Sequence, residues 1–494
     1  MLLDKPDHLR AVSSRFDPGT AIAAVASIVA FAVAAFSPAL FNDGDTYWHI
    51  RAGEWMLAHH AVLRTDPFSY TYHGAPWDTQ EWLAEILMAL FYGWSGWSGI
   101  AVLFAAAFGA TALLLASELR RWLRPLSLAV TLLLALGCVG VGMLARPHLL
   151  TFPLVVLWTR ELLRAREEGR APGWFLLPVM VLWANLHGSF VFGLALVLPF
   201  AAEAVTPAGQ NRAQCASAWG KFFAAAIVAG MLTPQGVYGL IFPFRLTAMT
   251  QIAFIREWNS SSFDTLTPLE IALLTALYVF LSRGVRVGFF RLLTLLGLLH
   301  MALQHERQQT LLALCGALIL AKPMGMALNP ATVGPCEAHR RNGVLWPALV
   351  VLAALAGLRL ALPVHRPGDE MSLKSALAQL PADYRNTPVF NDYSFGAYLI
   401  FSGIKPFIDS RADLYGDAFV LTYRKMAAGE DTLIAAAVRR YAIRWALLRP
   451  GNGANSYFSA ACGWERSYAD RFTILYVNRA RSGECPGASK TPSF

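Results

Sequence analysis

Long apolar runs recur along this chain from about residue 20 to about residue 362 and then stop. A helix that crosses a bilayer needs about 20 predominantly apolar residues. Hydrophobic residues make up 56% of the sequence and charged residues 15%, whereas soluble domains carry about 25% charged residues. We therefore expect a mostly helical, polytopic membrane domain over residues 1–362, followed by a smaller domain over residues 363–494.

The apolar runs predict eleven transmembrane helices. The first run follows Lys5, Arg10 and Arg15 and has no small-residue cleavage site, so we expect an uncleaved span and not a signal peptide. Polar residues interrupt segment 173–206, where two crossings are expected, joined either by a tight turn or by part of a polar cavity wall. The predicted spans are residues 20–41, 97–118, 126–144, 148–163, 173–186, 189–206, 222–240, 267–282, 287–303, 308–322 and 344–362.

The net charge of +9 could indicate nucleic-acid binding, but most Lys and Arg residues lie in short loops between the apolar runs. Basic residues in such loops set membrane topology, because they stay on the cytoplasmic side. With a cytoplasmic N-terminus, most loop cations fall on that side. We therefore expect no nucleic-acid partner and a multi-pass protein of the bacterial inner (plasma) membrane. Membrane lipid surrounds it, and the C-terminal domain is periplasmic.

The pattern changes after about residue 363, where short β-like runs alternate with helical stretches and predict a small α/β domain. Within it, Asp409 and Arg411 either bind a sugar or a peptide, or form a structural ion pair. Cys462 and Cys485 could form a disulfide if the domain is periplasmic. The expected strands are 388–390, 405–408, 443–448 and 472–478, and the expected helices are 371–380, 393–402, 417–427 and 431–441.

Two far-side loops, at about 42–96 and 232–266, are too long to be simple connectors. In the first, a short helix is expected from Tyr47 to Leu57. A second helix is expected to be amphipathic and to lie in the membrane interface, with Thr79, Gln80, Glu81 and Glu85 off its apolar face. That face comprises Trp82, Leu83, Ile86, Leu87, Leu90, Phe91 and Trp94.

The stretch from Phe41 to Ile50 reads Phe-Asn-Asp-Gly-Asp-Thr-Tyr-Trp-His-Ile and follows directly on the first predicted span. It places two carboxylates, Asp43 and Asp45, two residues apart. Such a pair can share a divalent cation such as Mg²⁺ or Mn²⁺, or one carboxylate can act as a base while the other positions it. The alternative is structural: Asp45 caps a helix that begins near Thr46.

An aspartate-bearing loop after the first span resembles the GT-C superfamily of membrane glycosyltransferases, of the dolichyl-phosphate-mannose and aminoarabinose transferase type. Residues 50–57 are similar to the first interfacial helix of that family, and the stretches 66–68 and 76–83 resemble the rest of its first loop. The resemblance covers residues 20–120 well and the other spans only in layout. This sequence lacks the adjacent Asp-Glu of protein O-mannosyltransferases and the Trp-Trp-Asp motif of oligosaccharyltransferases.

The resemblance implies a polyprenyl-phosphate-linked sugar donor, with Asp43 or Asp45 activating or orienting an acceptor. A lipid phosphate that leaves as an anion needs nearby positive charge or a metal ion. Ionisable residues close to membrane spans often mark function. The alternative for each one is a snorkelling or salt-bridged loop charge. The expected substrate-binding residues are His49, Arg146, His148, His187, Arg256, Glu257, His305 and Arg307.

The sequence thus favours a glycosyltransferase that transfers a sugar to a glycan, lipid or protein acceptor on the periplasmic face. A transporter or lipid flippase is an alternative, although it predicts ionisable residues near the membrane midplane and two related halves. The third possibility is an assembly protein without catalysis, whose membrane part anchors the C-terminal domain.

Overall fold

The computed structural model describes residues 17–206, 211–250, 258–329, 344–364 and 368–479. The fold is mostly α, with eighteen α-helices and a small C-terminal sheet in this part of the chain. The chain divides into two compact units. Unit 1 comprises Met1–Leu40, Phe91–Phe244 and Ala253–Pro363, and unit 2 comprises Phe41–Leu90, Arg245–Ile252 and Val364–Phe494.

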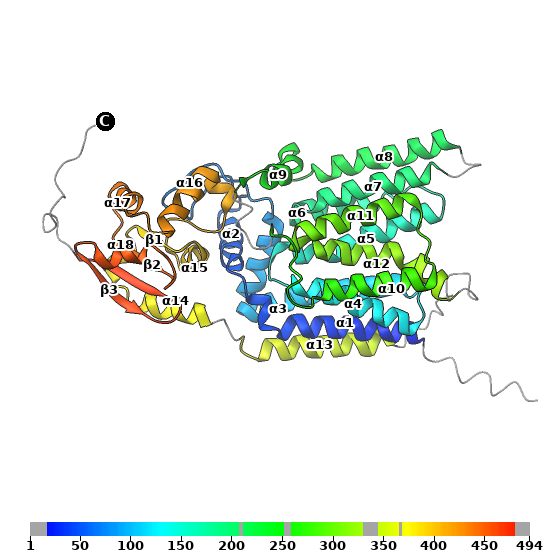
Figure 1. Cartoon of the computed structure of the whole chain (residues 1–494), viewed down its shortest axis with the longest axis horizontal. Helices are drawn as coiled ribbons and strands as arrows, with labels where there is room; N and C mark the ends of the chain where they lie inside the picture. The colour runs from blue at the N-terminus through cyan, green and yellow to red at the C-terminus, as the bar shows by residue number, and fades with distance from the viewer. Residues whose placement is uncertain (1–16, 207–210, 251–257, 330–343, 365–367, 480–494) are drawn as a thin grey trace, which may run out of the picture. The chain divides into compact units, whose positions relative to one another are not determined.

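Unit 1 is a bundle of long apolar helices, several of which run side by side (Figure 1). Helix α3 (Trp82–Leu119) reaches it from unit 2 and is kinked at Ser95 and Gly96, where the backbone angles are not helical. The other helices are α1 (Pro18–Phe36), α4 (Pro125–Val141), α5 (Pro147–Glu167), α6 (Leu176–Leu186), α7 (Phe190–Ala204), α8 (Arg212–Gly230), α9 (Val237–Thr247), α10 (Pro268–Arg283), α11 (Phe289–Gln304), α12 (Gln309–Leu328) and α13 (Leu345–Ala361).

Ten of the predicted spans each match one of these helices, and the expected break between 173–186 and 189–206 is a turn. There Trp183 Nε1 donates to Ser189 Oγ (2.9 Å), and the Ser189 amide donates to His187 Nδ1 (3.1 Å). The predicted span 222–240 is wrong. It merges the end of α8 with the start of α9, which are separated at Pro234, a residue without an amide hydrogen, and at Gly236, where φ is 56°.

In the part of the chain that the structure describes, three helices are long and apolar enough to cross a membrane: Pro18–Phe36, Trp82–Leu119 and Glu306–Leu328. Other apolar helices, such as α4 and α10, have 17 and 16 residues. Large apolar side chains on them are nevertheless exposed: Leu126 is 78% exposed and Leu281 is also 78% exposed. On α10, Leu274, Leu277, Tyr278 and Leu281 are exposed at helical spacing and form an apolar stripe, a feature that marks contact with a membrane or a partner. The eleven crossings remain a prediction.

Ion pairs join one set of helix ends in unit 1. Glu118, near the end of α3, pairs with Arg164 of α5. Arg291, near the start of α11, lies 3.0 Å from Glu203 at the end of α7 and 3.5 Å from Glu167 at the end of α5. Helix α11 is therefore antiparallel to α5 and α7. Many of the loop cations that we assigned to the cytoplasmic side are thus paired with glutamates at this end.

Unit 2 combines the first long loop with the C-terminal segment, although the sequence led us to assign residues 42–96 to the membrane domain. Its sheet has the strand order β1-β2-β4-β3. Strand β1 (Val389–Asn391) is parallel to β2 (Trp445–Leu448), while β4 (Ile474–Asn478) is antiparallel to β2 and to β3 (Trp464–Ala469). Phe390 pairs with Ala446, which pairs with Tyr476.

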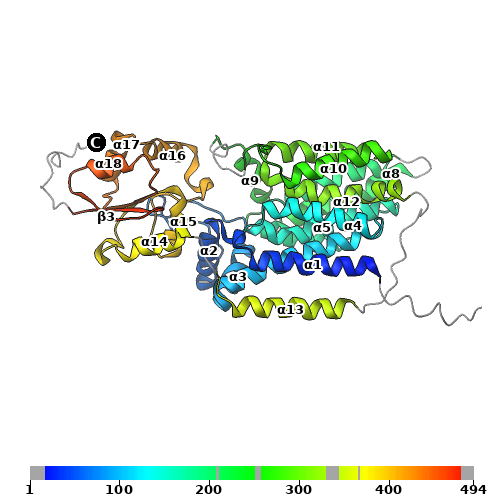
Figure 2. The ribbon, with the colours of Figure 1, turned by 60° about the horizontal axis from the view of Figure 1, so that its bottom comes forward.

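Helices cover both faces of this sheet (Figure 2). Helices α16 (Ala412–Ala427), α17 (Asp431–Arg440) and α18 (Asn455–Ala460) lie on one face, and α14 (Gly368–Ala378) lies on the other. Two further helices, α2 (Asp45–His59) and α15 (Gly396–Phe401), pack against each other. The first loop contributes four residues to the core that contains Phe390 and Tyr476: Ala52, Met56, Leu63 and Trp77.

The sequence prediction missed β3 and α18, and the strand predicted at 405–408 is wrong. Residues 405–408 form an irregular segment whose polar backbone groups bond to side chains. The amide of Phe407 donates to Asn391 Oδ1 (2.8 Å), and the carbonyl of Ile408 accepts from Asn391 Nδ2 (2.8 Å). The carbonyl of Phe407 accepts from Thr71 Oγ1 of the first loop (2.8 Å). These bonds replace a strand partner.

The polar residues that we placed off the apolar face of the second loop helix are mostly buried. Thr79 is 3% exposed, Gln80 is 8% exposed and Glu85 is fully buried. The reason is a close approach of α2 at Gly53. A methyl group placed on Gly53 would lie 2.0 Å from the carbonyl oxygen of Glu85. Glu85 on α3 therefore faces α2 and not water, while Thr79 and Gln80 are buried in the segment that precedes α3.

Candidate functional site

Asp43 and Asp45 lie half-buried at the start of α2. Asp45 is the first helical residue and Gly44 is the capping residue, without a side-chain cap bond, so the alternative that Asp45 itself caps the helix is wrong. The Asp45 amide donates instead to Asp43 Oδ1 at 3.3 Å. Negative charge is favourable at a helix N-terminus, where free amides carry partial positive charge. The helix start therefore holds both carboxylates in a defined place.

The C-terminal segment lies next to this acidic pair within unit 2. A methyl group placed on Gly44, between the two aspartates, would lie 3.7 Å from the carbonyl oxygen of Ser394. Two residues after Asp45, the ring of Tyr47 packs against Tyr398 and Phe401 of α15, each with a centroid distance of 5.2 Å. The turn between β1 and α15 thus fixes the surroundings of the two carboxylates.

His49, predicted to bind substrate, is only 3% exposed and lies between two glutamates. Its Nδ1 is 3.2 Å from Glu85 Oε1, and its Nε2 is 3.7 Å from Glu81 Oε2. The second oxygen of Glu85 accepts a hydrogen bond from Thr79 Oγ1 at 2.7 Å. This buried network joins α2 to the start of α3. It makes His49 a residue that positions the acidic helix, through its carboxylate partners.

A second buried network links the first loop to the C-terminal segment. The fully buried guanidinium of Arg411 forms a bidentate pair with Asp409, at 2.8 Å from Nε to Oδ1 and 2.7 Å from Nη2 to Oδ2. Its Nη1 donates to Asp66 Oδ1 of the loop at 2.7 Å. Tyr415 donates its hydroxyl to Asp409 Oδ2 at 2.7 Å. The structural reading of the Asp409–Arg411 pair is therefore confirmed.

Aromatic rings of the loop enclose this charged centre. The Arg411 guanidinium lies 4.6 Å from the Trp77 ring centroid and 5.4 Å from that of Phe68. Burial alone would lower the pKa of Arg411, but Asp409, Tyr415 and Asp66 together hold it well above its ordinary value. The arginine is thus charged at any physiological pH. Asp409 of the same segment compensates this charge, and the further bond to Asp66 ties the loop to the C-terminal segment.

Two histidines of the predicted set come together in unit 1. The rings of His148, at the start of α5, and His187, at the turn before α7, are 6.1 Å apart. His148 Nε2 lies 3.3 Å from the carbonyl oxygen of Gly142. Arg146 is the N-cap residue of α5 and precedes His148 by two positions. These three predicted residues therefore lie at the end of the bundle where α5 begins.

His305 and Arg307 form a second predicted group, at the turn between α11 and α12. His305 Nδ1 is 2.8 Å from the carbonyl oxygen of Trp258, and the Arg307 guanidinium lies 4.7 Å from the Trp258 ring centroid. Because α11 is antiparallel to α5, its C-terminal end lies at the same end of unit 1 as His148. Arg256 and Glu257 lie outside the described residues.

The predicted site residues therefore fall on both units. Asp43, Asp45 and His49 belong to unit 2, and the predicted histidines and arginines described above belong to unit 1. In the part of the chain that the structure describes, no three or more His, Cys, Asp or Glu residues are placed to hold a metal ion. A Mg²⁺ ion prefers six oxygen ligands and is often held by one or two carboxylates plus substrate phosphate and water. Asp43 and Asp45 fit that minimal role, and metal binding there stays a prediction.

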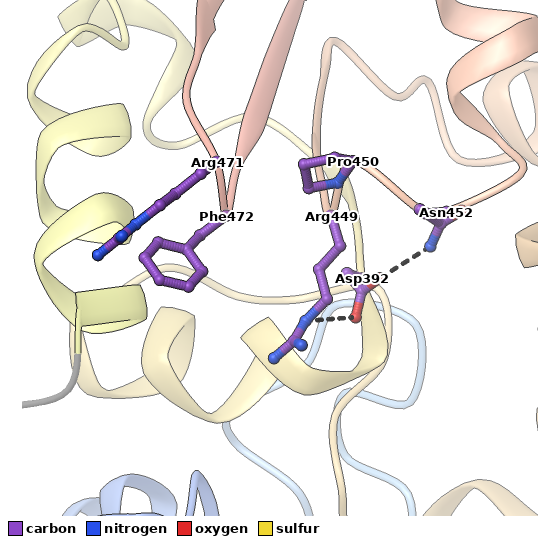
Figure 3. Close-up of a pocket in the computed structure, with 7 residues that line it drawn as sticks. Asp392, Arg449, Pro450, Asn452, Arg471 and Phe472 are labelled. Atoms are coloured by element: carbon purple, nitrogen blue, oxygen red, sulfur yellow. Dashed lines mark hydrogen bonds and ion pairs between the residues drawn. The ribbon is translucent and has the colours of Figure 1, made fainter.

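A pocket of about 400 Å³ lies at the edge of the sheet where β1 and β2 end and β4 begins. The sequence prediction missed it, because its residues come from three separate turns. Figure 3 shows Arg449 beside Asp392, with Arg471 and Phe472 reaching the pocket from the turn between β3 and β4. The lining residues are Asp392, Arg449, Pro450, Gly451, Asn452, Arg471 and Phe472.

Asp470 fixes the turn that carries Arg471 and Phe472. Partial burial would raise the pKa of Asp470, but hydrogen bonds from the Ser372 hydroxyl, the Phe472 amide, the Tyr468 hydroxyl and the Thr473 amide lower it. A carboxyl whose folded-state pKa is depressed stabilises the fold above its unfolded pKa, about 3.9. That contribution is lost as the pH falls through the lower folded-state value.

We therefore expect Asp470→Asn to lower the urea midpoint of unit 2 at pH 7. The difference from the parent protein should shrink as the pH falls below about 4, because the parent then loses the same charge. Asp383→Asn, at an exposed position of unit 2, is the matched control. A difference that is constant between pH 7 and pH 3 would contradict the role of the Asp470 charge.

The described cysteines Cys138, Cys215 and Cys315 are free, whereas Cys462 is disulfide-bonded. The predicted partner of Cys462, Cys485, lies outside the described residues.

No protein-family model matches this sequence, and no curated protein matches it.

Proposed function

We propose that this chain is a glycosyltransferase of the inner membrane, which moves a sugar from a polyprenyl-phosphate-linked donor to a periplasmic acceptor. In this proposal the ten predicted spans that match a helix cross the membrane, α8 takes the place of the predicted span 222–240, the N-terminus is cytoplasmic and the C-terminal domain is periplasmic. The observation that carries the proposal is the half-buried pair Asp43 and Asp45 at the start of α2. The pair follows shortly after α1, one of the three helices long and apolar enough to cross a membrane.

In the proposed reaction, Asp43 or Asp45 accepts the proton of an acceptor hydroxyl while the hydroxyl oxygen bonds to the anomeric carbon of the donor. The bond from that carbon to the phosphate oxygen breaks, and the lipid phosphate leaves as an anion. Preorganised positive charge stabilises such a developing anion. The sequence-based candidates for this charge are Arg146 and Arg307 of unit 1, and the candidates for further polar contacts are His148, His187 and His305.

The test uses the full-length protein in proteoliposomes with a polyprenyl-phosphate sugar that is radiolabelled in the sugar. Glycans, lipids and proteins extracted from bacterial envelopes serve as acceptors. We expect label to leave the lipid donor and to become linked to an acceptor. Label that crosses the membrane but stays on the lipid would indicate a flippase. Label that neither moves nor transfers would contradict both activities. A reporter fused after Phe494 should be active only in the periplasm.

A further inference from the structure

We propose that the pocket at the carboxyl edge of the unit 2 sheet binds a sugar that carries a phosphate or a carboxylate group. Crevices outside the carboxyl ends of parallel strands are common ligand sites in α/β folds. Here the ends of β1 and β2 supply Asp392 and Arg449, and the turn before β4 supplies Arg471. The proposal goes beyond the transfer reaction, because binding to this pocket does not depend on it.

Two arginines give the pocket its attraction for an oxyanion. Among the described residues, Arg471 has no acidic partner, and its guanidinium lies 4.5 Å from the Phe472 ring centroid. The side chain of Arg449 is 51% exposed and lies 3.9 Å from Asp392 Oδ1, so its charge is only partly compensated. The planar guanidinium fork matches phosphate and carboxylate oxygens. An anionic group therefore fits beside Arg471.

The opposite wall of the pocket favours hydroxyl groups. Asp392 Oδ2 accepts a hydrogen bond from Asn452 Nδ2 at 2.8 Å, and Asp392 Oδ1 accepts one from the Ser394 hydroxyl at 2.8 Å. A second negative group against this carboxylate would be repelled, whereas a neutral hydroxyl can donate to it. The ligand should therefore be bifunctional, with hydroxyls toward Asp392 and an anion toward Arg471.

Phe472 and Pro450 supply the apolar surface that such a ligand needs. Figure 3 shows the Phe472 ring between the side chains of Arg471 and Arg449. A sugar ring presents a face of C–H groups that can pack on an aromatic or proline ring, while its hydroxyls point sideways. A bare inorganic anion would leave this surface and the hydroxyl-directed wall unused.

Within unit 2, a single residue, Ser394, lies between the pocket and the acidic pair. The Ser394 hydroxyl accepts a hydrogen bond from Arg449 Nε at 2.8 Å. The carbonyl oxygen of the same Ser394 would lie 3.7 Å from a methyl group on Gly44, between Asp43 and Asp45. If the proposed transfer is correct, the pocket is placed to hold an anionic sugar of the acceptor. That assignment alone rests on the proposed function.

Direct binding to the full-length protein in nanodiscs tests the proposal, by calorimetry with four probes. Glucose 1-phosphate and glucuronate should bind, whereas glucose and inorganic phosphate should bind at least about tenfold more weakly. Arg471→Gln and Arg449→Gln should each weaken the binding of both anionic sugars about tenfold or more, because each removes a charged hydrogen-bond donor. Arg479→Gln, at an exposed arginine that pairs with Glu465, is the matched control and should bind as the parent does.

Four results would overturn the proposal. Equal binding of glucose and glucuronate would show that the anionic group is not recognised. Equal binding of inorganic phosphate and glucose 1-phosphate would show that the sugar is not recognised. Unchanged affinity in both arginine variants, or no binding by the folded parent protein, would show that this pocket does not bind such sugars. Parallel melting curves establish that the variants fold. Because binding is read without sugar transfer, failure here is separate from failure of the transfer assay.

Discussion

Arg411→Met should detach the first loop from the C-terminal segment and destabilise unit 2 by about 3–5 kcal/mol, the cost of breaking a buried ion pair. The variant leaves Asp409 and Asp66 buried without their shared cation. Methionine fills much of the space but donates no hydrogen bonds. Removing the charge costs more than removing an ordinary hydrogen bond because both carboxylates are fully buried, where water cannot replace the guanidinium.

Hydrogen exchange measured by mass spectrometry on the full-length protein gives the sharpest readout. Peptides that cover residues 64–80 should exchange about 100-fold to 1,000-fold faster or more in Arg411→Met, because exchange follows the free energy of local opening. Arg449→Met, at a half-exposed position of the same unit, is the control and should change exchange there little. The triple variant Arg411→Met, Asp409→Leu, Asp66→Leu should recover part of the loss, since it leaves no buried carboxylate unpaired. Unchanged protection of the loop in Arg411→Met would contradict the role of this centre.

The helices of unit 1 were largely predictable from the sequence, because an apolar run and its end signals are local. Helix α10, predicted over 267–282, begins at Pro268 after the Thr267 cap and ends at Arg283 before Gly284, whose φ is 60°. Where hydropathy and chain geometry disagree, the same reasoning fails. Residues 222–240 carry no charge and are polar only at Thr233 and Gln235, so the break between α8 and α9 is marked mainly by the backbone preferences of Pro234 and Gly236.

Local sequence patterns did not predict that the first loop and the C-terminal segment together form unit 2. Asp66 and Arg411 are 345 positions apart, and nothing in the sequence near either residue indicates the other. The same limit explains Glu85, which has the position of a solvent-facing residue on an amphipathic helix but is fully buried. Its partner His49 lies 36 positions earlier, and the contact exists because Gly53 lets the two helices approach.

The acidic pair shows the reverse case, in which a local motif indicates chemistry and the structure supplies its surroundings. Two aspartates separated by one glycine are visible in the sequence. Their half-burial and the neighbouring Ser394 carbonyl depend on the C-terminal segment. The spacing of the two aspartates in the sequence therefore indicates which residues to mutate. The fold shows how buried they are and what lies next to them.

Asp43→Asn and Asp45→Asn should each slow sugar transfer, and the variant at the catalytic base should lose about 10²-fold to 10⁴-fold in kcat, the usual contribution of a general base. Asparagine keeps the size of the side chain and one acceptor oxygen. The Asp43→Asn side chain can therefore still accept the hydrogen bond that the Asp45 amide donates at the start of α2. What it removes is the negative charge and the ability to take a proton at neutral pH.

The control is Asp78→Asn, in the same loop, where the aspartate is 43% exposed and forms a surface ion pair with Arg64 at 2.9 Å. Surface pairs contribute about 0–1 kcal/mol, so this variant should fold and transfer sugar as the parent does. A base lost at Asp43 or Asp45 should lower kcat more than it raises KM, because proton removal matters in the transition state and not in the bound ground state. Full turnover in both asparagine variants would remove these carboxylates from the chemistry. It would leave Asp43 the task that the geometry already shows, which is to accept the hydrogen bond of the Asp45 amide at the start of α2.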